Sequence, residues 1–156
     1  MTDATSPDDP ELEPPEERPG SGYTGGIGSR REARDRAVAL LYEAEAKSET
    51  AGDLLASLPV APEEFTVEIL HGVDEHRDAI DELLTTYALD WKLERMPALD
   101  RAVLRVATYE LAYRPEIPLG AVISEAVELA KTYSTEESGK FVNGLLSAIG
   151  RATREA

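Results

Sequence analysis

The sequence of 156 residues contains no cysteine. This absence excludes a disulfide framework, a thiolate nucleophile and a zinc site with cysteine ligands. No stretch approaches the roughly 20 apolar residues that span a bilayer, and the N-terminus lacks the basic region and apolar run of a signal peptide. From these absences we expect a cytoplasmic protein with no membrane partner.

Basic residues are scarce, because 16 lysines and arginines stand against 31 aspartates and glutamates, for a net charge of −15. Such an excess of acid usually argues against nucleic acid, since phosphate binding needs a cationic surface. The charge is uneven, however. Residues 1–29 hold seven acidic residues against Arg18 alone, together with many prolines and glycines. This composition cannot bury a core, so we expect a disordered acidic tail.

The tail contains Gly20, Gly22 and Gly25 in a G-x-G-x-x-G spacing. In a dinucleotide-binding loop this motif follows a buried strand and opens a helix, whereas here it follows the letters EEPPEERP. A flexible linker is the favoured interpretation.

Alternation of apolar and polar residues is also missing, and apolar residues recur instead at helical spacing from Ser29 onward. Capping boxes are predicted at Ser29 with Glu32 and at Ser134 with Glu137. The predicted helical segments are 29–47, 53–58, 63–89 with a kink at Gly72, 98–114, 118–133 and 135–153. Segment 98–114 is apolar nearly all round and should be central. The fold class is all-α, with six or seven helices in two layers or sub-bundles, about 30–90 and 91–156.

Four arginines crowd into the stretch SRREARDR at the start of the first helix. Arg30, Arg31 and Arg34 share one arc of about 100°, whereas Arg36 points elsewhere and can pair with Glu32. The three clustered cations stand at the positive end of the helix dipole, where their charge is locally unfavourable. A bound anion would relieve that cost. The anion is a nucleic acid or, alternatively, an acidic protein.

Tyr42 projects on the Arg31 side of the same helix. Its ring offers a stacking surface for an unpaired base, or it packs at the helix boundary with its hydroxyl in water. Arg101 and Arg105 lie in the most apolar helix and are interpreted as members of structural ion pairs.

His71 and His76 are five residues apart, which places their rings roughly 140° apart on a helix, so no metal is assigned. Glu125 and Glu128 lack the partners of a catalytic site. We therefore expect neither enzymatic activity nor a cofactor.

Three motifs in the C-terminal half, LDRAVLRVATYEL, PLGAVISEAVELAKTYS and SGKFVNGLL, follow one another closely. Together with RREARDRAVALLYEAE near the start, they resemble the NusB family of bacterial transcription antitermination factors over about residues 30–152. The resemblance implies one helical domain at 30–156, made of two three-helix sub-bundles.

The resemblance also implies a function without catalysis. Family members bind a single-stranded boxA element in nascent ribosomal RNA beside a small-subunit ribosomal protein that acts as NusE. The pair joins a complex on RNA polymerase and suppresses chiefly Rho-dependent termination. Some family members also form homodimers.

Site residues implied by the resemblance fall in two segments. The RNA-binding positions are Arg30, Arg31, Arg34, Tyr42, Lys140, Phe141 and Asn143. Glu137 matches an acidic position near the partner surface. An alternative for Phe141 stays open, because FVNGLL also fits a helix that packs its apolar face, Phe141 included, against the core. In addition, Glu32 stands where relatives often have a basic residue, which weakens the cationic patch.

Two other functions compete with this prediction. The first is a helical adaptor that uses its arginines for an acidic protein. The second is an enzyme fragment, because a similar domain precedes the catalytic domain of some rRNA cytosine methyltransferases; the chain has no room for that domain. Separately, the acidic tail could compete with RNA for the arginines.

Overall fold

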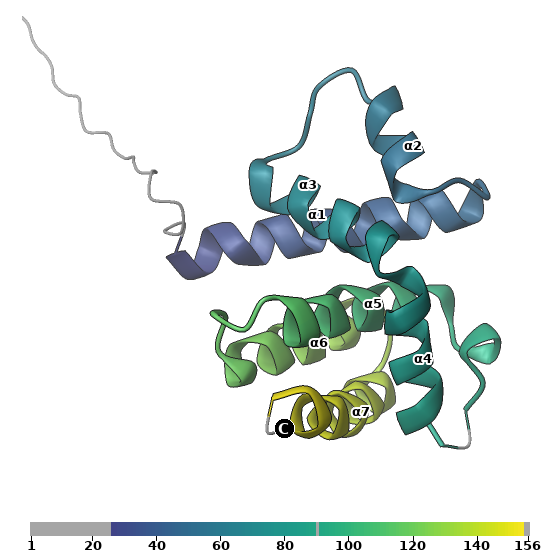
Figure 1. Cartoon of the computed structure of the whole chain (residues 1–156), viewed down its shortest axis with the longest axis vertical. Coiled ribbons are helices and arrows are strands. Elements are labelled where there is room, and N and C mark those ends of the chain that lie inside the picture. The colour runs from purple at the N-terminus through teal and green to yellow at the C-terminus, as the bar shows by residue number, and fades with distance from the viewer. Residues whose placement is uncertain (1–25, 90, 155–156) are drawn as a thin grey trace, which may run out of the picture. The chain divides into compact units, whose positions relative to one another are not determined.

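The computed structural model describes residues 26–89 and 91–154 (Figure 1). Most of the predicted acidic tail, including its spaced glycines, lies outside the described residues. The chain divides into a unit that ends at Glu32 and a unit that begins at Ala33.

The described residues form helices joined by loops, and no strand occurs among them. In chain order the helices are α1 (Gly26–Ala46), α2 (Ala51–Ser57), α3 (Glu64–Glu75), α4 (Arg77–Tyr87), the 3-10 helix η3 (Leu93–Arg95), α5 (Ala98–Tyr113), α6 (Leu119–Tyr133) and α7 (Glu136–Arg154). The predicted all-α fold class is confirmed.

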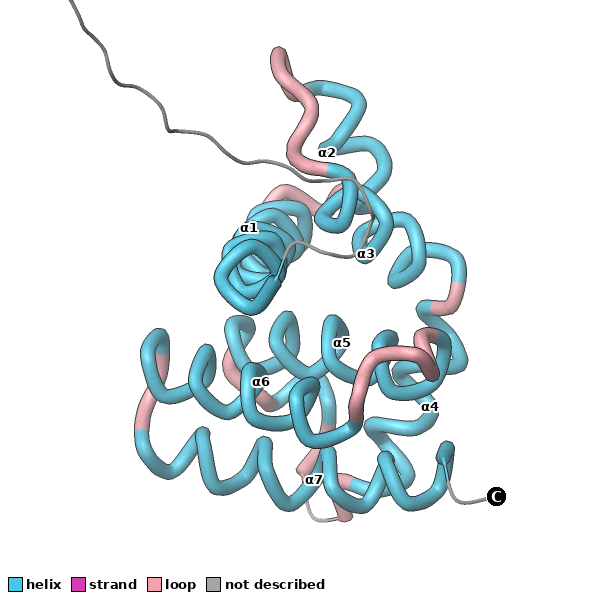
Figure 2. The backbone as a smooth tube through the Cα atoms, turned by 90° about the vertical axis from the view of Figure 1, so that its left-hand side faces the viewer, coloured by secondary structure: helices cyan, strands magenta, loops and turns pink. Residues whose placement is uncertain are grey.

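Helix α5 is the centre of the unit that begins at Ala33. Its buried positions run without a gap from Ala102 to Leu111. Helices α3, α4, α6 and α7 all pack against it, and Figure 2 shows α5 and α6 as a layer between α7 and the Ala33–Ala46 part of α1. The central place predicted from its apolar circumference is therefore confirmed.

Helix α1 begins at Gly26 rather than at Ser29, so the predicted capping box of Ser29 and Glu32 does not mark its start. Glycine in a helix costs only about 1 kcal/mol relative to alanine. A helix stabilised further along the chain can therefore extend back through Gly26 and Gly28.

The predicted kink at Gly72 is wrong. The helix is interrupted instead at His76, between the end of α3 and the start of α4. Gly72 lies inside α3 and faces the ring of Tyr109, where a Cβ atom would come within 2.1 Å of Cε1. Glycine at this position therefore serves the close approach of α3 to α5. Helix α4 contacts α3, which precedes residue 90, and also α5 and α7, which follow it. These contacts cross the predicted boundary between the sub-bundles, so that boundary stays a prediction.

Candidate nucleic-acid interface

Arg34 lies in the interior, with only 5% of its surface exposed. Its Nε donates to Glu110 Oε2 at 2.8 Å and its Nη2 donates to Oε1 at 2.7 Å. The Glu110 side chain is completely buried, and the guanidinium also lies 5.7 Å from the centre of the Phe65 ring. The anion that offsets the charge of Arg34 is therefore Glu110 of α5, a partner that the sequence did not predict. The contact of Arg34 with RNA stays a prediction.

Arg30 and Arg31 belong to the unit that ends at Glu32 and lie in the first two turns of α1. The Arg31 side chain is exposed and Arg30 is partly exposed. A side chain must be exposed to contact a phosphate. Binding of RNA by both arginines therefore stays a proposal.

Tyr42 lies on α1 with 44% of its surface exposed. The preceding residue, Leu41, is buried, so the helix turns its apolar side inward and leaves the tyrosine at the boundary. Part of the ring is accessible to a base. The stacking of a base on Tyr42 therefore stays a proposal.

Tyr133, at the end of α6, lies close to the same part of α1 and was not predicted as a site residue. Its hydroxyl donates a hydrogen bond to Asp35 Oδ1, and this bond raises the pKa of the tyrosine. Asp35 precedes Tyr42 by two helical turns and therefore shares its side of α1. The end of α6 thus approaches this side of α1. No sequence signal indicates a contact between residues 98 positions apart.

The other predicted site residues lie in the first turns of α7. Thr135 caps this helix, since its Oγ1 accepts a hydrogen bond from the Ser138 amide at 3.0 Å. The predicted box of Ser134 with Glu137 therefore misplaces the cap by one residue. A threonine hydroxyl serves the same purpose as serine.

Lys140 and Asn143 are exposed. The Glu137 side chain is 85% exposed and lies 3.6 Å from Lys140 Nζ. Phe141 is half-buried and packs against the apolar core, as the packing alternative predicts. Its ring centre also lies 5.8 Å from that of Trp91. This end of α7 therefore presents a lysine, an amide and part of an aromatic pair to solvent.

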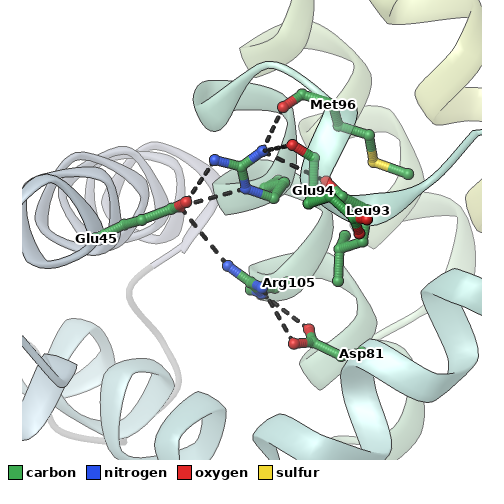
Figure 3. A network of polar contacts seen from close by, with 7 residues as sticks. Glu45, Asp81, Leu93, Glu94, Met96 and Arg105 are labelled. Atoms are coloured by element: carbon green, nitrogen blue, oxygen red, sulfur yellow. Dashed lines mark hydrogen bonds and ion pairs between the residues drawn. The ribbon is translucent and has the colours of Figure 1, made fainter. Parts of the chain in front are cut away.

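Arg101 and Arg105 are held in a charged network that joins α1, α4 and α5 (Figure 3). Arg101 pairs with Glu45. Arg105 Nε donates to Asp81 Oδ1 at 2.9 Å, and Arg105 Nη1 lies 3.8 Å from Glu45 Oε1. The prediction that both arginines form structural ion pairs is confirmed. Their partners are Glu45 of α1 and Asp81 of α4, which lie far from them in the sequence.

An open pocket of about 260 Å³ lies beside this network, lined by Glu45, Leu93, Glu94, Arg101 and Arg105. Burial lowers the pKa of the nearby Arg77 guanidinium, and the positive charge of Arg105 lowers it further. Because the lining carries acids and bases in equal number, the pocket has no preference for an anion over a cation.

His71 is exposed, and His76 stacks on the ring of Tyr113 with 3.7 Å between the ring centres. Within residues 26–89 and 91–154, no three His, Asp or Glu side chains are grouped to hold a metal ion. The helices of this part of the chain are also too short or too polar to span a membrane.

Comparisons with known proteins agree with the resemblance to the NusB family. The family description "NusB family" matches residues 31–151. The transcription antitermination protein NusB of Arthrobacter sp. (strain FB24) is 47% identical over 127 residues, which cover 79% of this chain and 93% of the relative.

Solved structures extend the agreement to the fold. T. maritima NusB superimposes with a TM-score of 0.71 at 37% identity, covering 78% of this chain and 90% of that one. A chain from a crystal structure of antitermination factors NusB and NusE in complex with dsRNA superimposes with a TM-score of 0.69 at 29% identity, covering 79% of this chain and 96% of that one. The chain therefore belongs to the NusB family of transcription antitermination proteins.

Proposed function

We propose that this chain is a transcription antitermination factor that binds single-stranded boxA RNA of nascent rRNA transcripts together with a small-subunit ribosomal protein in the NusE role. The main support is its membership of a family in which a structurally similar protein has been crystallised with NusE and RNA. Through this pair the chain would join the antitermination complex on RNA polymerase and suppress Rho-dependent termination in the cytoplasm.

The proposal gives each exposed site residue a role suited to its chemistry. Arg30 and Arg31 neutralise phosphates, because a guanidinium can donate two parallel hydrogen bonds to a phosphate. Tyr42 and Phe141 stack on unpaired bases. Lys140 contacts a phosphate, and the exposed side-chain amide of Asn143 can form a hydrogen bond with the edge of a base.

Arg34 has a different place in this proposal. Its guanidinium is committed to Glu110 by two hydrogen bonds, so its main contribution is to anchor α1 on α5. Glu137, which is highly exposed, is kept as a candidate contact of the ribosomal protein. A homodimer of this chain would hide these residues, and sedimentation with and without RNA tests whether it forms.

A salt titration tests the RNA role of the arginines. Each phosphate neutralised on single-stranded RNA contributes about −0.7 to the slope of log affinity against log salt. The double variant Arg30→Ala/Arg31→Ala should therefore bind boxA RNA more weakly, with a slope shallower by about 1.4. Arg36→Ala is the matched control, since Arg36 is an exposed arginine of the same helix. Equal slopes for all three proteins would contradict the assignment.

The competing function is a helical adaptor whose arginines contact an acidic protein. It predicts that RNA affinity is weak and independent of RNA sequence, whereas the same arginine variants weaken binding to the acidic protein partner. Measuring both ligands with each variant separates the two functions.

A further inference from the structure

Trp91 lies beside Phe141 and is half exposed. Its ring centre is 5.8 Å from that of Phe141, with 56° between the ring planes, a distance and tilt typical of aromatic pairs. Phe141 packs against the core on its other side, whereas 51% of the Trp91 surface remains open to solvent. Phe141 therefore serves as a fixed support for an accessible tryptophan.

A backbone hydrogen bond links Trp91 to the end of α4. The Trp91 amide donates to the Ala88 carbonyl at 3.3 Å, which closes a turn after α4. Within that turn Leu89 has a φ of 58°, a left-handed conformation that is unfavourable for leucine. Strained backbone of this kind is often kept where it positions a functional group.

The C-terminal side of the same loop is held by Arg101. Its Nη1 donates to the Leu93 carbonyl at 3.4 Å and also to the Met96 carbonyl, and the Met96 side chain is buried. Trp91 thus lies between its own hydrogen bond to Ala88 and a segment held by Arg101, and both limit the conformational freedom that is lost when a ligand covers its ring.

The charges around the ring pair favour RNA as that ligand. Lys92 follows Trp91 directly in the sequence and Lys140 precedes Phe141; both lysines are exposed, and Glu137 lies 3.6 Å from Lys140 Nζ. An aromatic ring with a cation next to it in the sequence suits a nucleotide, in which an apolar base is joined to a phosphate. The same end of α7 also carries Asn143, a proposed RNA contact.

We propose that Trp91 and Phe141 together form a stacking site for an unpaired base of bound single-stranded RNA. The inference rests on the proposed function and extends it, because it adds Trp91 to the RNA-binding surface. Phe141 would hold the tryptophan ring in place, and the base would cover the exposed part of that ring.

Trp91 can report on its own contacts, because it is the sole tryptophan of the sequence. BoxA RNA carrying a fluorescent label at one end is titrated with the full chain, with and without the ribosomal protein, and its anisotropy measures binding. In parallel, unlabelled boxA RNA is added to the chain while Trp91 emission and its quenching by acrylamide are recorded. We expect RNA to reduce Trp91 emission and shield it from acrylamide, with the same midpoint as the anisotropy change.

Variants test the stacking energy. Trp91→Ala should weaken RNA binding by roughly five- to 150-fold, the effect of losing one base stack, whereas Trp91→Phe keeps a ring and should lose much less. Val60→Ala is the control, because Val60 is a highly exposed apolar residue of another loop. Circular dichroism checks that each variant keeps its helices.

The outcomes are distinguishable. RNA binding by anisotropy without a change at Trp91, or with full affinity in Trp91→Ala, would overturn the stacking site and leave the proposed function intact. A Trp91 signal that responds to the ribosomal protein alone would assign the rings to a protein contact instead. If boxA RNA bound no better than a scrambled RNA, with or without the ribosomal protein, the proposed function itself would be refuted.

Discussion

The ion pair of Arg34 with Glu110 allows a sharp prediction about stability. Both side chains are at least nine-tenths buried and joined by two hydrogen bonds. Replacing Arg34 with methionine fills similar space but leaves a buried carboxylate without its cation. Removing one partner of a buried pair costs about 3–5 kcal/mol. We expect Arg34→Met to lower the free energy of unfolding by about this amount.

The size of that loss is large for a single domain, whose total stability is about 5–15 kcal/mol. Glu110→Leu should be similarly destabilising, because it leaves the buried guanidinium unpaired. In the double variant Arg34→Met/Glu110→Leu neither charge remains, and apolar replacement of a buried pair is often neutral or stabilising. The double variant should therefore recover to within about 1 kcal/mol of the parent.

Urea denaturation followed by circular dichroism measures these free energies, with the m-value as a check that the unfolding transition is unchanged. A loss below about 1 kcal/mol for Arg34→Met would show that water reaches the pair and would refute the reasoning. A double variant as unstable as the sum of the two single variants would also contradict it, because the two effects would then be independent.

The same double variant tests whether Arg34 contacts RNA. If its role is to anchor α1, the folded double variant keeps boxA affinity within about twofold, because a shared phosphate contact would be worth more than that. A loss as large as that of Arg30→Ala/Arg31→Ala would return Arg34 to the RNA-binding set.

Three further predictions concern stability and the tail. Arg154 donates hydrogen bonds to the carbonyls of Glu110, Leu111, Arg114 and Ile117, so Arg154→Ala should cost about 2–3 kcal/mol in urea denaturation; a change no larger than that of the exposed Arg151→Ala would contradict this. Gly72→Ala forces a methyl group into the Tyr109 ring and should cost about 1–3 kcal/mol. Gly144→Ala meets no atom within 4 Å and should be neutral or stabilising by up to about 1 kcal/mol; equal melting temperatures for the two variants would refute the packing argument. Deleting residues 1–19 should tighten RNA binding, most at low salt, and an unchanged affinity would exclude competition by the acidic tail.

Local patterns were enough to predict most of the helices. Spacing of apolar residues located the helical segments, and the apolar circumference of 98–114 predicted the central place of α5. However, α3 and α4 were predicted as one segment, and the short helix η3 was not predicted. Boundaries were less predictable, because caps depend on one side chain. Thr135 rather than Ser134 caps α7, since its hydroxyl is the one that accepts the hydrogen bond of the Ser138 amide.

Long-range contacts account for what the sequence did not reveal at the candidate site. The charge of Arg34 looks uncompensated on its own helix, because its partner lies 76 residues away. Likewise, Gly72 resembles a helix breaker until the Tyr109 ring is placed against it. Trp91 gave no signal of a site, because its contact with Phe141 joins residues that are far apart in the sequence.

The most direct test of the central claim is the sequence preference of RNA binding. Anisotropy of labelled boxA RNA is compared with that of a scrambled RNA of equal length and composition, with the isolated chain and with the ribosomal protein added. The account predicts weak binding by the chain alone and a clear preference for boxA RNA, at least about tenfold or 1.4 kcal/mol, once the partner is present. Equal affinity for both RNAs with the partner present would contradict it.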